Sequence, residues 1–169
     1  MNVLSYSADE ILKIAISIEQ NASIFYQDAA RFSNQNNALK DLFLNLGAME
    51  REHAKTFGRM RQELSDNERT VQQYDPGNEM VFYLQGMAGL HGWEGKNGPN
   101  ARLAGSEKPQ DVLSIAVQAE KETIYLYNFL RDFVPPRKGK DDVDRIIKEE
   151  MHHVALLNRE LSKIAGVTV

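Results

Sequence analysis

Apolar residues recur every three or four positions along four stretches of the chain, and this spacing predicts four long amphipathic helices. The helices are expected at about residues 8–32, 38–64, 109–134 and 141–165. Ser7 is a candidate cap of the first helix, and Pro109 is a favoured first-turn residue of the third. Pro135 and Pro136 should end the third helix. No stretch indicates a strand, so the predicted fold class is all-α.

The connections between these helices predict how they pair. Short turns join the first helix to the second and the third to the fourth, so each pair should form an antiparallel hairpin of a four-helix bundle. Residues 66–108, which hold seven of the eleven glycines, are far longer than an ordinary helix connection. We expect this crossover to run the length of the bundle, with the third helix parallel to the second. Residues 78–90 form a candidate short helix within it, and residues 1–169 should form a single domain.

The two predicted hairpins repeat one pattern of polar residues. Each contains a glutamate, a tyrosine seven residues later, and a Glu-x-x-His motif that begins 31 or 30 residues after the first glutamate. The residues are Glu19, Tyr26, Glu50 and His53 in the first hairpin, and Glu120, Tyr127, Glu150 and His153 in the second. Seven residues are about two helical turns, so each glutamate shares a helix face with its tyrosine. One Glu-x-x-His motif is a weak signal, whereas two in matching contexts are specific.

Four glutamates and two histidines interrupt the apolar seams, the inward-facing lines of the helices, at one level of the bundle. An ionised glutamate is rarely buried without a partner, because its desolvation costs several kcal/mol. The seams offer no matching ring of lysine or arginine, whereas two divalent cations would offset four carboxylate charges and leave the histidines neutral. The sequence therefore predicts a dinuclear metal site whose ligands are Glu19, Glu50, His53, Glu120, Glu150 and His153.

Composition narrows the class of protein. Hydrophobic residues make up 42% of the chain and charged residues 26%, which is typical of a soluble globular domain. The net charge of -4 offers no positive surface to nucleic acid. No apolar run approaches the roughly 18 residues of a membrane-spanning helix, and the first residues do not resemble a signal peptide, so we expect a cytoplasmic protein without a membrane partner. The absence of cysteine excludes iron-sulfur centres and leaves carboxylate and imidazole as metal ligands.

The combination of Glu-x6-Tyr and Glu-x-x-His motifs in both hairpins resembles the ferritin-like superfamily and, within it, the rubrerythrin-like diiron domains, over residues 8–165. The resemblance implies that the six predicted ligands bind two irons, which react with hydrogen peroxide or oxygen in a non-haem diiron oxidoreductase. Manganese and zinc also suit these ligands. The alternatives are a ferritin-type protein that oxidises and sequesters iron, and a non-enzymatic helical module stabilised by metal.

Several positions depart from the family patterns. Thr123 stands where rubrerythrin peroxidases usually have an additional glutamate, so the ligand set instead resembles the ferroxidase centre of bacterioferritin. Arg51 replaces the haem-binding methionine of bacterioferritin, so no haem is expected. A chain without cysteine has no rubredoxin domain, so its electrons should come from a separate donor protein. We also expect a homodimer.

Two pairs of aromatic or histidine residues leave alternatives open. Tyr26 and Tyr127 occupy positions typical of core packing, and each hydroxyl either bonds a ligand carboxylate or serves packing alone. His91 and Trp93 lie in the crossover, where they would line an entrance to the metals or plug one end of the bundle.

The fourth predicted helix contains a second Glu-x-x-His motif, one residue out of register with the first. Glu149 and His152 form this pair, and Arg145 marks the polar face on which it lies. Glu150 and His153 instead follow the apolar seam and match the repeat in the first hairpin. We therefore predict that Glu150 and His153 face the core.

Overall fold

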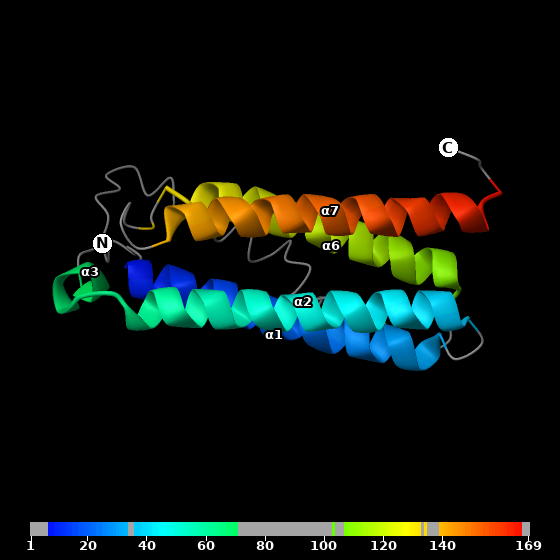
Figure 1. Cartoon of the computed structure of the whole chain (residues 1–169), viewed down its shortest axis with the longest axis horizontal. Helices are drawn as coiled ribbons and strands as arrows, with labels where there is room; N and C mark the ends of the chain where they lie inside the picture. Colours follow the sequence, from blue (N-terminus) through cyan, green and yellow to red (C-terminus); the bar gives the residue numbers. More distant parts are fainter. Residues whose placement is uncertain are drawn as a thin grey trace, which may run out of the picture.

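The computed structural model describes residues 7–33, 36–70, 103, 107–132, 134 and 139–166, and every long element in this part of the chain is a helix. The helices are α1 (Ala8–Phe32), α2 (Asn37–Gln62), α3 (Asp66–Thr70), α6 (Pro109–Leu130) and α7 (Lys140–Ile164) (Figure 1). The all-α fold class is confirmed. None of these helices combines the length and the apolar character that spanning a bilayer requires, within the described ranges.

Local chemistry explains where the helices begin and end. Ser7 caps α1, since its Oγ accepts from Glu10 N–H and the Glu10 carboxylate accepts from Ser7 N–H at 2.8 Å. Asn36 caps α2 through a single hydrogen bond, in which its Oδ1 accepts from Leu39 N–H at 3.1 Å. α6 ends at Leu130, four residues earlier than predicted. A proline ring clashes with the carbonyl four residues before it, and for Pro135 that carbonyl belongs to Arg131.

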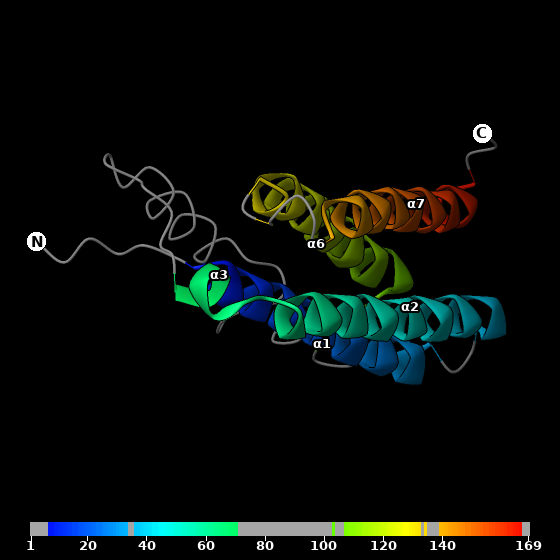
Figure 2. The ribbon, with the colours of Figure 1, turned by 60° about the vertical axis from the view of Figure 1, so that its left-hand side comes forward.

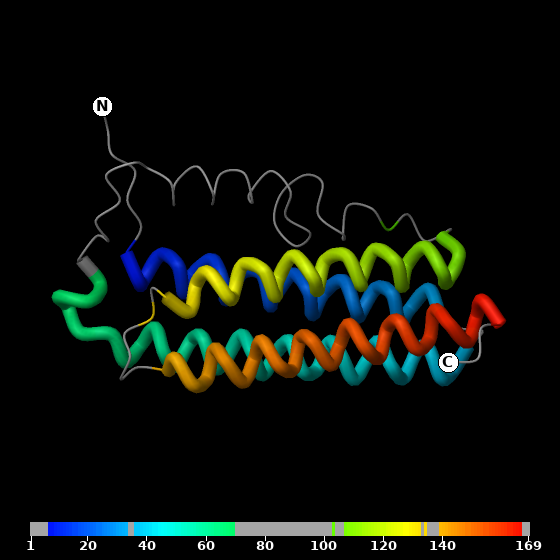
Figure 3. Tube along the Cα trace, turned by 90° about the horizontal axis from the view of Figure 1, so that it is seen from above, coloured from blue at the N-terminus to red at the C-terminus, as the bar shows by residue number. Residues whose placement is uncertain are grey.

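The four long helices form two hairpins, α1 with α2 and α6 with α7, which Figure 2 shows as two layers. Contacts between α1 and α6 and between α2 and α7 join the hairpins. As expected from the crossover, α6 runs in the same direction as α2 (Figures 1 and 3). The candidate helix at residues 78–90, with His91 and Trp93, lies outside the described residues, and the extent of the single domain stays a prediction.

The core combines large aromatic side chains with one close helix approach. Phe43 and Phe57 are fully buried, as is Tyr26. Gly47 of α2 lies against α1, and Ser23 Oγ donates to its carbonyl at 2.9 Å. A Cβ at Gly47 would lie 3.2 Å from Tyr26 Cβ, tighter than most such contacts. The missing side chain therefore lets α2 pack closely beside Tyr26.

Candidate metal centre

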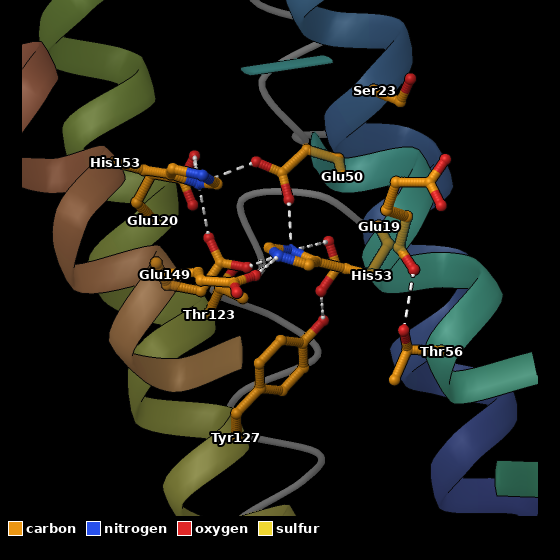
Figure 4. A network of polar contacts seen from close by, with 12 residues as sticks. Glu19, Ser23, Glu50, His53, Thr56, Glu120, Thr123, Tyr127, Glu149 and His153 are labelled. Carbon is orange, nitrogen blue, oxygen red and sulfur yellow. Dashed lines mark hydrogen bonds and ion pairs between the residues drawn. The ribbon is translucent and has the colours of Figure 1, made fainter. Parts of the chain in front are cut away.

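The structure brings all six predicted metal ligands into one buried cluster at the middle of the bundle. Figure 4 labels all of them except Glu150. Every long helix contributes: α1 and α6 supply one glutamate each, and α2 and α7 supply a glutamate and a histidine each. None of the six is more than 3% exposed: Glu19, Glu50, His53, Glu120, Glu150 and His153. The charged residues that interrupt the apolar seams of both hairpins therefore lie together in the core.

The cluster contains two overlapping sets of four residues that could each hold an ion. In each set, one ligand atom per residue lies within 4.8 Å of the others. The first set is Glu19, Glu50, His53 and Glu150, and the second is Glu50, Glu120, Glu150 and His153. Because Glu50 and Glu150 belong to both sets, their carboxylates lie where they could bridge two neighbouring ions.

Both imidazole rings turn Nδ1 toward these shared carboxylates. His53 Nδ1 lies 2.8 Å from Glu150 Oε1 and 3.1 Å from Glu50 Oε2. His153 Nδ1 lies 2.9 Å from Glu150 Oε2 and 3.0 Å from Glu50 Oε1. The rings are stacked with their centroids 5.8 Å apart. The donor atoms of the two hairpins thus face one another across a small space.

Burial and mutual repulsion change the protonation of the carboxylates. Burial raises the pKa of Glu19 well above its ordinary value, and repulsion from Glu150 adds to the effect. Burial likewise raises the pKa of Glu120, with repulsion from Glu50 second. Burial would also raise the pKa of Glu150, but the hydrogen bond with His153 and ion pairing with both histidines outweigh it and lower that pKa to about 2. The metal-free cluster is therefore unevenly charged.

Burial acts in the opposite direction on the two histidines, because their charged form is the protonated one. Burial alone would lower the pKa of His153, but its contacts with Glu150 and Glu50 raise that pKa to about 10. The pKa of His53 is also raised, because Glu150, Glu19 and Glu50 outweigh the effect of burial. In the metal-free protein at neutral pH, protons on both imidazoles therefore compensate part of the carboxylate charge.

Proton compensation is incomplete, since two carboxylate oxygens of the cluster are buried without a hydrogen bond. Glu50 Oε1 and Glu150 Oε1 each lie close to an imidazole nitrogen, at 3.0 and 2.8 Å, but in an orientation that makes no hydrogen bond. A buried acceptor without a donor is unfavourable, and a carboxylate oxygen is a preferred ligand of divalent cations. The residues present therefore fit a pair of metal ions.

Each tyrosine hydroxyl donates to the glutamate of the opposite hairpin. Tyr26 on α1 bonds Glu120 on α6. Tyr127 on α6 bonds Glu19 on α1 (Figure 4). Burial raises the pKa of both tyrosines, so both hydroxyls keep their protons. The rings also pack in the core, that of Tyr127 edge-on to Phe57 at 5.1 Å. The tyrosines therefore serve both packing and hydrogen bonding.

We expect Tyr26→Phe and Tyr127→Phe each to destabilise the metal-free protein by about 1–3 kcal/mol, because a buried carboxylate loses its donor while the ring remains. Urea unfolding would measure the change. Tyr125→Phe is the control, since Tyr125 is 63% exposed. A core variant that unfolds at the same urea concentration as Tyr125→Phe would contradict the expectation.

The structure also separates the two overlapping motifs of α7. Glu150 and His153 are fully buried, whereas His152 is exposed, as the apolar seam predicts. Glu149 is 39% exposed, yet its Oε2 lies 2.7 Å from His53 Nε2. The sequence pattern places Glu149 on a polar face and gives no signal for this contact. A position one residue before Glu150 lies toward the edge of the buried face, where it can reach α2 from the side.

We expect His153→Ala to lose at least one metal ion per chain and His152→Ala to keep two. The first change removes a buried nitrogen of the cluster, and the second alters an exposed side chain. Metal content measured after anaerobic loading and desalting tests both variants under the same conditions. The opposite result would show that the binding register of α7 is wrong by one residue.

The structure shows the contacts of Thr123 and Arg51, the two residues that depart from the family patterns. Thr123 is buried beside the cluster, and its hydroxyl donates to Ala119 O of its own helix at 3.1 Å. α6 therefore supplies one carboxylate to the cluster, that of Glu120. Arg51 is exposed on α2 and donates to Ser23 Oγ at 3.0 Å. The expected absence of haem stays a prediction.

Comparisons with known proteins identify the same architecture. Residues 10–94 match the family model described as rubrerythrin. A crystal structure from Thermotoga maritima, described provisionally as a ferritin-like diiron-carboxylate protein, matches with a TM-score of 0.70 and 22% identity, over 93% of this chain and 95% of that one. No curated protein shows significant similarity in sequence. With half of its length matched by the family model and a ferritin-like helical bundle around a buried Glu/His cluster, the chain belongs to the rubrerythrin family.

Proposed function

We propose that this protein is a non-haem diiron oxidoreductase whose iron pair reacts with hydrogen peroxide or oxygen. The observation that carries the proposal is the pair of overlapping ligand sets that share Glu50 and Glu150 in a fully buried site. Four carboxylates and two neutral imidazoles carry four negative charges, which two divalent cations offset. The family supports iron, although the same ligands suit manganese and zinc.

The side chains of the cluster would have different roles in holding two metal ions. Glu50 and Glu150, which belong to both ligand sets, would help to hold both ions, whereas Glu19 and Glu120 would each help to hold one. The tyrosine hydroxyls that bond Glu19 and Glu120 would limit the rotation of these carboxylates. Burial excludes bulk water and strengthens the electrostatic interactions within the site. When bound, iron would supply the change of oxidation state that the protein side chains themselves lack.

The reaction also needs a source of electrons, since the reduction of one hydrogen peroxide to two waters consumes two electrons and two protons. The chain contains no cysteine and so no rubredoxin-type centre of its own. We therefore propose a separate electron donor protein. The homodimer, the cytoplasmic location and the absence of a nucleic acid partner stay predictions.

Stopped-flow spectroscopy tests the proposed reaction. Protein loaded anaerobically with Fe(II) is mixed with hydrogen peroxide in one experiment and with oxygen in another, and the absorbance of ferric carboxylate is followed. We expect two irons per chain and oxidation faster than that of free Fe(II) with at least one oxidant. Fewer than two irons per chain, or oxidation at the rate of free Fe(II) with both oxidants, would contradict the proposal.

Ferritin-type iron oxidation and sequestration is the second candidate, and Thr123 favours it. Because Thr123 bonds its own helix and adds no carboxylate, the cluster keeps the four-glutamate, two-histidine composition that resembles a bacterioferritin centre. Sequestration would require assembly into a shell of many chains, which light scattering in solution detects directly. A small assembly favours the oxidoreductase. A protein that binds metal but gives no absorbance change with either oxidant would instead be a metal-stabilised module.

A further inference from the structure

The two halves of the candidate metal centre differ at the outward nitrogen of each histidine. Both rings present Nδ1 to the shared carboxylates at similar distances. On the other side of the ring, His53 Nε2 lies 2.7 Å from Glu149 Oε2. His153 Nε2 is buried and has no hydrogen-bond partner among the described residues. The two histidines of the repeated motif therefore differ in the hydrogen bonding of Nε2, although their Nδ1 atoms have similar surroundings.

The sequence offers an explanation for this difference at one equivalent position of the two repeats. Glu149 immediately precedes Glu150 on α7, and Met49 immediately precedes Glu50 on α2. A carboxylate is a strong acceptor for an imidazole N–H, whereas a thioether sulfur is only a weak one. The second hairpin therefore supplies an acceptor for the histidine of the first, whereas among the described residues no acceptor bonds His153 Nε2.

This acceptor decides which nitrogen of His53 is free to bind a metal. An ionised carboxylate only accepts, so Nε2 must donate its hydrogen to Glu149. A neutral imidazole carries one N–H, so Nδ1 of His53 then holds the lone pair that faces the cluster. His153 would have to bind through Nδ1 with a buried and unsatisfied Nε2–H, which is unfavourable. No hydrogen bond at Nε2 holds the ring of His153 in its orientation, whereas Glu149 holds that of His53.

We propose that the two metal positions have unequal affinities and that Glu149 makes the position beside His53 the tighter one. The inference rests on the proposed dinuclear centre and adds an order of loading to it. Glu149 acts as a positioning residue, because it contacts His53 Nε2 and belongs to neither ligand set. Removal of such an outer partner typically lowers metal affinity by about 10- to 100-fold. The inequality in this chain should have a similar size.

Anaerobic titration of the metal-free protein with Co(II), followed by visible absorbance and calorimetry, measures both steps without any redox reaction. Wild type should bind two ions, the first at least tenfold more tightly than the second. Glu149→Met reproduces the residue of the other hairpin and should weaken the tight step at least tenfold, so that the two affinities become similar. Met49→Glu should tighten the second step by a comparable factor. Glu52→Met is the control, since Glu52 lies beside His53 in sequence but its side chain is 69% exposed.

Crystals containing one Co(II) per chain should show the ion beside His53, and His53→Ala should remove the tight step while His153→Ala removes the weak one. Equal affinities in wild type would overturn the inference, and so would a tight step that persists in Glu149→Met or an ion beside His153. A second step unchanged in Met49→Glu would also count against it. These outcomes leave the dinuclear centre intact, whereas a wild-type chain that binds fewer than two ions contradicts the proposed function itself.

Discussion

Glu50→Ala and Glu150→Ala are each expected to reduce metal binding from two ions per chain to none. Each carboxylate belongs to both ligand sets, so its removal takes one ligand from each ion. Removal also leaves the remaining charges of the cluster without a shared partner in a site closed to water. Metal analysis after anaerobic Fe(II) loading and desalting measures the stoichiometry directly.

Two further variants make this result specific. Glu19→Ala should lose binding at one position only, because Glu19 belongs to a single ligand set. Glu52→Ala should keep both ions, because its side chain is exposed on the outer face of α2. Circular dichroism would establish that each variant remains helical. Full occupancy in a helical Glu50→Ala or Glu150→Ala protein would refute the assignment of the shared ligands.

The metal-free protein is expected to lose several kcal/mol of stability as the pH rises from about 6.5 to about 10. The pKa of His153 is raised from 6.5 to about 10 in the fold, so its contribution is fully present below pH 6.5 and disappears as the pH rises through 10. The raised pKa values of Glu19 and Glu120 act in the same direction, since the folded state holds protons that the unfolded state releases. One pKa unit corresponds to about 1.4 kcal/mol.

The lowered pKa of Glu150 acts in the opposite direction, but only between about 4.5 and about 2, below this range. Urea unfolding of metal-free protein at several pH values measures how the free energy of unfolding changes with pH.

Metal binding should release protons near neutral pH, because the ions replace the protons on the imidazoles, and a pH indicator in weak buffer detects this release. The double variant Glu19→Gln with Glu120→Gln should be more stable than wild type at high pH. A flat or rising stability curve for the metal-free wild type would contradict the expectation.

The sequence alone determined the helices and the members of the cluster. Apolar spacing predicted α1, α2, α6 and α7 with bounds within a few residues, because an amphipathic helix must bury one face. Charged residues that interrupt such a face, such as Glu50 and Glu150, have to be compensated inside the protein. Burial can therefore be inferred from periodicity, and the chemistry of the donor set follows from the residue types.

Tertiary structure decided how these side chains contact one another across helices. The sequence places Tyr26 and Glu19 on one helix face, but the hydroxyl of Tyr26 bonds Glu120 of the other hairpin. Glu149 lies at the edge of a polar face, but the packing of α7 beside α2 brings it to His53. Periodicity specifies the face of a helix to within one residue. The rotation and axial offset of two packed helices decide which atoms meet, and both depend on how all four helices pack together.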